Sequence, residues 1–246
     1  MKKFFAFTLA EVLITLGVIG VVAALTIPAV ISNYEKKVIE EGFKKTYSDL
    51  YNLIKRSEAD NGTYEEWDYT LSSANFVAKY FAPYINLTEC KGKSMPCFTN
   101  DGRTFNVWRY PGEKECTLGG NYKVSPKYLL DDGRSMMVMV RHTPMYSGYW
   151  SYVVFVVDVN GQKGHSVMGE DVFVFSLSNY LRYGDRGKPI KGFHVGGSEN
   201  DGDFSATTES IRNNWCKVGN NMGTHKCGLL IQRNGWKFPK DYPIKF

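Results

Sequence analysis

The first 35 residues, MKKFFAFTLAEVLITLGVIGVVAALTIPAVISNYE (residues 1–35), decide how the chain is organised. Between Lys3 and Glu35 only Glu11 carries a charge, and the uncharged run Val12–Ile31 has the roughly 20 residues that a helix needs to cross a bilayer. Nearly all the charged side chains lie downstream. The sequence therefore predicts one apolar N-terminal segment on a polar body, and it excludes both a disordered chain and a multi-spanning membrane protein.

Three interpretations compete for residues 1–31: a cleaved secretory signal, a plain signal anchor, and a short leader followed by an assembly helix. Glu11 helps to separate them, because a carboxylate in an apolar helix costs about 2.5–3.5 kcal/mol on insertion scales and usually has a function. Neither the signal nor the plain anchor needs such a residue, so the third interpretation is favoured.

The stretch Phe7-Thr8-Leu9-Ala10-Glu11-Val12-Leu13-Ile14 resembles the N-terminal signature of type IV pilins and type II secretion pseudopilins. The resemblance implies a leader of residues 1–6 that ends in Ala6, where the family usually has glycine. It also implies cleavage between Ala6 and Phe7 by a prepilin peptidase, and methylation of the new N-terminus at Phe7. Ala10 also departs from the family, which usually has a large apolar residue there.

Three further landmarks are in register with this start. Counted from Phe7, Glu11 is the fifth residue, where the family has its glutamate, and Gly20 and Pro28 match a common glycine and a helix-kinking proline. The resemblance implies that Phe7, Glu11 and Pro28 serve assembly, with Glu11 pairing with the N-terminal amine of an adjacent subunit. Such a pair acts as a register device more than as a source of stability.

The resemblance also implies partners and a location. The partners are other pilin or pseudopilin subunits through the N-terminal helix, the prepilin peptidase and an inner-membrane assembly platform. The precursor would be a single-pass protein of the bacterial inner membrane with an extracytoplasmic head, later part of a periplasmic or extracellular filament. The implied organisation is leader 1–6, membrane or filament-core helix 7–31, amphipathic stalk 32–60 and head 61–246.

An amphipathic pattern continues the helix beyond the apolar run. Phe43, Tyr47, Leu50, Tyr51 and Ile54 make one apolar stripe at helical spacing, and Asp60-Asn61-Gly62 is a stop signal. We therefore expect one helix from Phe7 to about Glu58, with Pro28 kinking or locally melting it. The stripe is interpreted as core that packs on the head.

The head reads mainly as strands. A short helix is expected over Ser73–Tyr84, and Gly184–Gly202 is expected to be an irregular excursion. The strand candidates, bounded by Asp132-Gly133 and Asn160-Gly161 turns, are Thr104–Arg109, Ser135–Val140, Tyr149–Val159, Val172–Leu177 and Leu229–Gln232. The predicted fold class is α+β: a pilin-like lollipop whose long helix packs by its C-terminal half on an antiparallel sheet.

Five cysteines follow the apolar segment, which suits disulfides in an exported head. Local pairs Cys90–Cys97 and Cys216–Cys227 are predicted, which leaves Cys116 without a partner. Cys97–Cys116 stays open as an alternative, because sequence alone does not fix connectivity.

The segment Asp158-Val159-Asn160-Gly161 invites a calcium interpretation, since Asp and Asn two residues apart with a glycine can open a calcium loop. Asp158, Asn160 and Asp171 are the candidate ligands, although Lys163 would repel a cation. A turn stabilised by the Asp and Asn side chains is the favoured alternative. No other cofactor is predicted.

Catalysis and nucleic-acid binding are not indicated by the sequence. The histidines, at positions 142, 165, 194 and 225, occur in no metalloprotease motif, and no nucleophile elbow or phosphate-binding loop is present. The net charge of +5 is diffuse. No enzyme is therefore expected, and the resemblance implies a structural filament subunit, a minor pilin or pseudopilin. The alternative is a membrane-anchored extracytoplasmic binding or adhesion protein that never polymerises.

Overall fold

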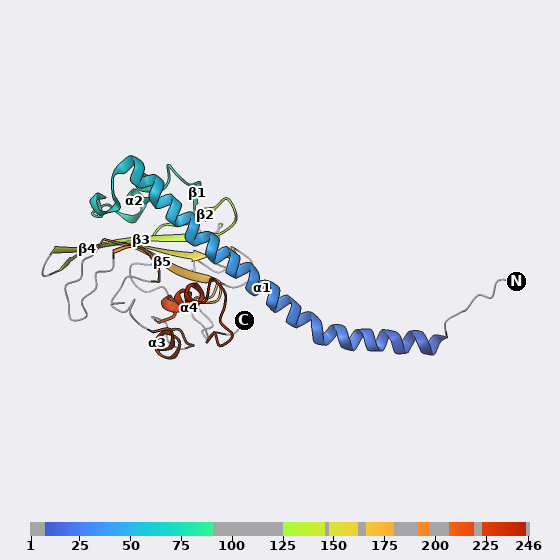
Figure 1. Cartoon of the computed structure of the whole chain (residues 1–246). Coiled ribbons are helices and arrows are strands. Elements are labelled where there is room, and N and C mark those ends of the chain that lie inside the picture. The colour runs from blue at the N-terminus through green and yellow to red at the C-terminus, as the bar shows by residue number, and fades with distance from the viewer. Residues whose placement is uncertain are drawn as a thin grey trace.

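A computed structural model describes residues 8–90, 125–145, 148–161, 166–179, 191–196, 207–218 and 223–244. These residues form a head from which half of one long helix, α1 (Leu9–Asn61), projects (Figure 1). The other half of α1 lies across a six-stranded antiparallel sheet. The arrangement is α+β, as the sequence predicts.

Helix α1 has 53 residues and begins and ends where local chemistry dictates. Thr8 caps its first turn, and Gly62 ends it with φ 75°, a left-handed conformation that glycine adopts without strain. Pro28 lies inside the helix, which is helical on both sides of it. The axis of α1 bends between the projecting part and the part on the sheet (Figure 1).

The sheet is a simple meander in which each strand pairs with the next one along the chain. Its strands are β1 (Leu87–Glu89), β2 (Lys127–Leu130), β3 (Ser135–Met145), β4 (Gly148–Asp158), β5 (Val172–Asn179) and β6 (Lys191–Val195). Strands β3 and β4 are the longest and pair from Ser135↔Asp158 onward. The Asp132-Gly133 turn joins β2 to β3, with Gly133 at φ 87°. The predicted strands over 135–140, 149–159 and 172–177 are confirmed.

Two expectations for the head are wrong. Leu229–Gln232 is not a strand but part of helix α4 (Cys227–Arg233), because a short apolar run buried on all sides has no period that separates the two structures. The 184–202 stretch is not wholly irregular, since it contains β6, which pairs with β5. Thr104–Arg109 lies outside the described residues.

The remaining helical elements are short. The predicted helix over 73–84 is confirmed but ends earlier, as α2 (Ser73–Tyr80), three residues before Pro83. Single turns follow α1 and precede α4: η1 (Tyr64–Glu66), α3 (Thr208–Ser210), η3 (Ile211–Trp215) and η4 (Gly223–Lys226). Helix α2 packs near β3, whereas α4 packs near β5 and β6, toward the other edge of the sheet (Figure 1).

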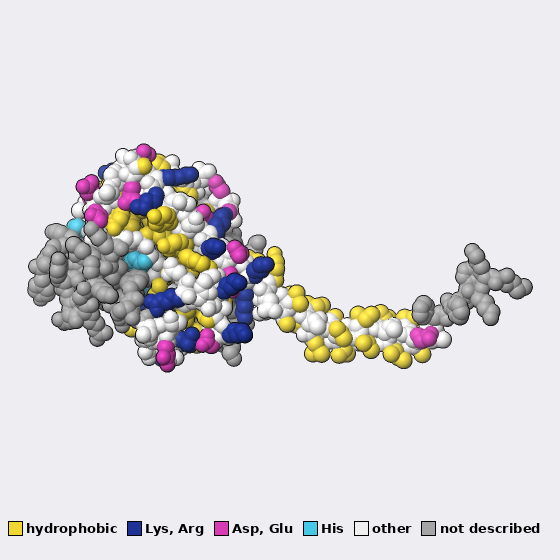
Figure 2. All heavy atoms as spheres, in the orientation of Figure 1, with side chains coloured by type: hydrophobic (Ala, Val, Ile, Leu, Met, Phe, Trp, Pro, Cys, Tyr) yellow, Lys and Arg dark blue, Asp and Glu magenta, His cyan; other side chains and the backbone are white. Residues whose placement is uncertain are grey.

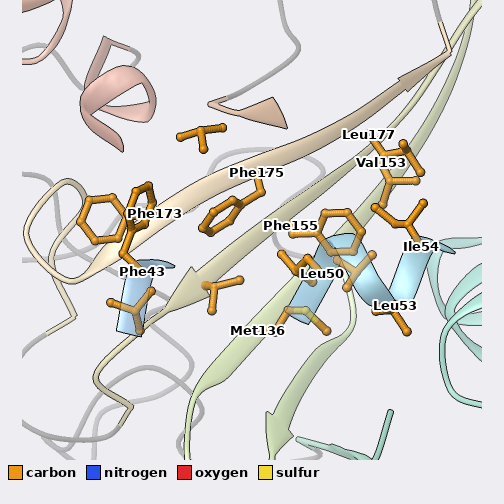
Figure 3. Packing of buried hydrophobic residues seen from close by; sticks show 14 of the residues in the cluster. Phe43, Leu50, Leu53, Ile54, Met136, Val153, Phe155, Phe173, Phe175 and Leu177 are labelled. Carbon is orange, nitrogen blue, oxygen red and sulfur yellow. The ribbon is translucent and has the colours of Figure 1, made fainter. Parts of the chain in front are cut away.

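The main core lies between α1 and one face of the sheet (Figure 3). Phe43 enters it from the helix, with its ring 4.6 Å from that of Phe173 on β5. Alternation along β4 sends Phe155 to this face and Val154 to the opposite face, where a second cluster forms. The stripe prediction is confirmed except at Tyr51, which is 44 % exposed.

A buried arginine fastens the β2–β3 turn to α1. Arg134 donates hydrogen bonds to the Thr46 hydroxyl at 2.7 Å and to the Asp132 carboxylate at 2.8 Å, and it also pairs with Asp49. Lys45 adds an ion pair to Asp132 at 2.6 Å. These side chains fix the stalk on the sheet, so the apolar half of α1 leaves the head in a defined direction.

Candidate functional site

The projecting half of α1 is the most unusual surface of the molecule. Within the described residues, every large exposed hydrophobic side chain lies in Leu9–Ile31 except Tyr34, Tyr51 and Val218. Exposure in this stretch runs from 41 % at Val12 to 79 % at Leu9. The helix is long and apolar enough to cross a membrane. Water is a poor solvent for such a surface, so a bilayer or other helices must cover it.

Glu11 takes part in a capping box at the start of this helix. Its carboxylate accepts hydrogen bonds from the Thr8 backbone N–H and hydroxyl, both at 2.8 Å, while the Glu11 N–H donates to the Thr8 hydroxyl at 3.2 Å. The carboxylate therefore satisfies backbone donors at the positive end of the helix dipole. This role was missed from the sequence, although the Thr8-x-x-Glu11 spacing is its known signature.

The other residues of the N-terminal signature take no part in this capping box. Ala6 and Phe7 lie outside the described residues. Gly20 faces open space, with no atom within 4 Å of where a β-carbon would sit. Pro28 lies near the end of the exposed apolar part. Within the described residues, nothing in the head contacts this half of the helix.

The calcium candidates do come together at one end of the sheet. Asp158 at the end of β4 accepts a hydrogen bond from the Ser166 hydroxyl at 2.6 Å. Asp171 accepts from the Val167 N–H at 2.6 Å and from the Asn160 side-chain amide at 3.3 Å. Both carboxyls are buried. The three residues that the sequence singled out therefore lie together, held by hydrogen bonds between the end of β4 and the segment before β5.

Burial and mutual repulsion in this cluster favour the protonated form of the two carboxyls. Burial raises the pKa of Asp158 to about 7, and burial together with the neighbouring Asp158 raises that of Asp171 well above its usual range. Two buried carboxyls this close do not readily ionise together. Among the described residues no cluster of three or more His, Cys, Asp and Glu side chains could hold a metal ion. Calcium binding here stays a prediction.

The C-terminal disulfide is confirmed. Cys216 and Cys227 are bonded, and both are fully buried between η3 and α4. Cys90 is also disulfide-bonded. Its predicted partner Cys97, and Cys116, lie outside the described residues, so the second pairing stays a prediction.

One polar pair on the sheet was missed from the sequence. His142 on β3 and Ser151 on β4 lie directly opposite each other, with Nδ1 and Oγ 2.8 Å apart. The pair joins residues from neighbouring strands, and only the register of the sheet reveals it. It is the kind of cross-strand contact that stabilises antiparallel sheets. His225 is buried and His194 is partly buried with its Nε2 shielded from solvent, and this desolvation lowers the pKa of each to about 4.

Comparison with known proteins gives the chain a family but no activity. A family of unknown function (DUF6613) matches residues 29–246, which is most of the chain. The chain belongs to this family. The match covers the stalk and the head and leaves out residues 1–28, which carry the pilin-like signature. No curated protein and no solved structure matches the chain.

Proposed function

We propose that this protein is a structural subunit, a minor pilin or pseudopilin, of a type IV pilus or a type II secretion-like filament. In this proposal the precursor spans the inner membrane once, and a prepilin peptidase cleaves it between Ala6 and Phe7. Subunits then leave the membrane and pack their N-terminal helices together in the core of the filament.

The exposed apolar half of α1 is the observation that carries the proposal. At 1.5 Å per residue, Leu9–Ile31 is about 35 Å long, enough to cross the hydrocarbon core of a bilayer. A plain anchor needs nothing more than this. The carboxylate of Glu11 is the additional feature, because in a filament core it can meet the positive N-terminus of a neighbouring subunit.

The capping box refines the part that Glu11 plays. Its two acceptor bonds come from Thr8 within the same chain, so the carboxylate is not without partners before assembly. A carboxylate has about four lone-pair sites, which leaves capacity for a second donor. Glu11 can therefore begin the helix in the monomer and still accept the amine of a neighbour in the filament.

The chemical state of the mature N-terminus tests the proposal. Mass spectrometry of the protein from its native membrane is expected to show loss of residues 1–6 and a methylated Phe7. Cleavage after Ala24, or an intact Met1, would defeat the proposal. An intact N-terminus on a protein that stays in the membrane would favour the non-polymerising binding or adhesion protein.

Paired variants separate capping from assembly. Glu11→Gln keeps an acceptor at the capping position but removes the charge, so it should be processed normally and fail to enter filaments. Thr8→Val removes the hydroxyl of the cap and keeps the charge, so filaments should still form. Glu35→Gln changes a carboxylate outside the apolar run and is the matched control. Normal filament entry of Glu11→Gln would refute the docking role.

A further inference from the structure

The C-terminal segment (Trp236–Ile244) runs beside α1 toward its apolar half. The Trp236 ring packs at a tilt against Phe43 and Tyr47, with ring centres 5.6 and 5.0 Å away, and two residues later the Phe238 N–H donates to the Glu40 carboxylate at 2.7 Å. Gly235 and Trp236, both with positive φ, turn the chain in this direction. The segment therefore ends at the pole of the head from which the apolar helix projects, as Figure 1 also shows.

Lysines gather at this pole. We name Lys36 and Lys37 of α1 together with Lys237 and Lys240 of the C-terminal segment the basic platform. Lys37, Lys237 and Lys240 are exposed. Figure 2 shows Lys and Arg side chains concentrated on the side of the head next to the projecting helix.

The acidic side chains near the platform are largely engaged by protein groups. Glu40 accepts the Phe238 N–H, and Asp241 forms an ion pair with Arg212 at 3.1 Å. Glu170, which lies close to Tyr242, also has an interaction partner. Glu35 and Glu41 are the other two acids on this part of α1. Lys37, Lys237 and Lys240 are exposed, as are Glu35 and Glu41, so the described part of this pole carries a small excess of positive charge.

Distance along the helix puts the start of the platform at the outer edge of the lipid headgroups, with the C-terminal lysines farther out. Headgroup regions add about 5–8 Å to each side of the hydrocarbon core. Lys36 and Lys37 are five and six residues beyond Ile31, or about 8–9 Å along the axis. The C-terminal segment contacts α1 at Glu40, which is about 14 Å beyond Ile31 along the helix axis. An extended lysine side chain together with one Debye length of about 8 Å spans this distance, so the charges of Lys237 and Lys240 can still act on the headgroups.

An aromatic residue stands at the same boundary. Tyr34 is 68 % exposed and follows Ile31 by less than one helical turn. Tyrosine favours the membrane–water interface, where its ring is in contact with lipid and its hydroxyl with water.

We propose that the basic platform binds anionic phospholipid headgroups and holds the head against the membrane surface before the subunit leaves the membrane. The proposal rests on the membrane-spanning part of the proposed function, and it does not need filament assembly. Each basic residue near an anionic surface strengthens binding about fivefold. Lys237 and Lys240 together would therefore favour the orientation in which the head touches the membrane surface about 25-fold over one in which it does not.

The test compares the full chain in vesicles of phosphatidylcholine with the full chain in vesicles that also contain phosphatidylglycerol. Amine-reactive labelling is followed by mass spectrometry, lysine by lysine. Labelling of Lys237 and Lys240 is expected to slow severalfold in the anionic vesicles and to recover at high salt. Lys55 and Lys79, on α1 and α2 of the distal head, are internal controls and should label equally. Equal labelling of Lys237 in both lipids would overturn the proposal.

Variants add a second readout. In anionic vesicles, hydrogen exchange across 236–244 is expected to be slower than in neutral ones, and the double variant Lys237→Gln/Lys240→Gln should lose that difference. The matched variant Lys55→Gln/Lys79→Gln should keep it. Protection that is the same in both lipids would refute lipid binding. A protein that responds to lipid but keeps residues 1–6 would refute the filament function alone.

Discussion

At the scale of single residues, the buried carboxyls of Asp158 and Asp171 have the clearest consequence for stability. Their pKa values in the folded protein are raised, so the folded state holds a proton that the unfolded chain releases near pH 4. Between that pH and about 7 the folded state binds more protons than the unfolded state. Stability is therefore fully present below the unfolded pKa and falls as the pH rises toward 7.

The variant Asp158→Asn should remove much of this fall. An amide oxygen can still accept the Ser166 hydrogen bond, and no proton is needed. Linkage allows up to about 1.4 kcal/mol per unit of pKa shift. Denaturant unfolding of wild type and variant at pH 5 and pH 8 measures the effect, and the variant should lose less stability at pH 8. The buried histidines give a slope of opposite sign in both proteins, which cancels in the difference.

Two controls sharpen this measurement. Asp241→Asn changes an exposed carboxylate and should leave the pH profile parallel to that of the wild type. Calcium added at pH 8 should stabilise the wild type, and not Asp158→Asn, if the cluster binds the ion. Parallel profiles for Asp158→Asn and wild type would show that the buried pair does not govern the slope.

At the scale of elements, α1 approaches the head closely at one of its glycines, whereas no other atom lies near a second glycine. A β-carbon on Gly42 would come within 2.6 Å of the Val159 carbonyl oxygen, whereas one on Gly20 would meet no atom within 4 Å. Gly42→Ala is therefore expected to push the helix from the sheet and cost about 1–3 kcal/mol. Gly20→Ala should leave the unfolding of the head unchanged, because a β-carbon at Gly20 would touch no other atom. Alanine also favours the helical conformation over glycine by about 1 kcal/mol.

The same pair of variants tests the assembly helix. If helices pack closely through Gly20 in a filament, Gly20→Ala should lower filament yield while the monomer keeps its stability. Thermal unfolding followed by filament recovery separates the two effects. Equal destabilisation by both variants would contradict the contacts described for Gly42.

Elements with a strong period were predictable from the sequence, and those defined by distant contacts were not. The β-branched and aromatic run over 149–159, bounded by turn signals, predicts β4, and Asp132-Gly133 predicts the turn between β2 and β3. In α4, by contrast, Gly228 packs against Val195 and Phe43, residues far away in the chain. Its neighbours are apolar on every side, so no period shows. Lys191–Val195 is short and rich in polar residues, and its pairing with β5 makes it a strand.

Among the candidate functional residues, too, those in local sequence patterns were predictable, and those brought together by folding were not. Glu11 and Pro28 are candidates because the signature is local, and Cys216–Cys227 was predictable because the two cysteines bracket a short loop. The basic platform joins residues 36–37 to 237–240, which only folding brings together. The contact between Phe238 and Glu40 spans 198 residues, and no local pattern announces it.

At the scale of the whole molecule, the core and the projecting helix are separable. Ile39 is the first residue of α1 that is buried, and the main core contains no residue before it. The clamp between Arg134 and Asp49 and the disulfide Cys216–Cys227 also lie in the head. Among the residues that the structure describes, the apolar half of α1 therefore adds surface that must be covered and takes no part in the core of the head.

A chain that begins at Ser32 should accordingly be soluble and folded without detergent when produced in an oxidising compartment. Its thermal unfolding should be cooperative and close to that of the full chain, because all buried core residues in the described part of the chain are retained. A chain that begins at Lys44 is the matched control: it loses Ile39 and Phe43, and removal of a buried phenylalanine alone costs about 3–5 kcal/mol. Circular dichroism melts distinguish the two. A Ser32 chain that melts without cooperativity would show that the projecting helix supports the head, and the division between assembly helix and head would then fail.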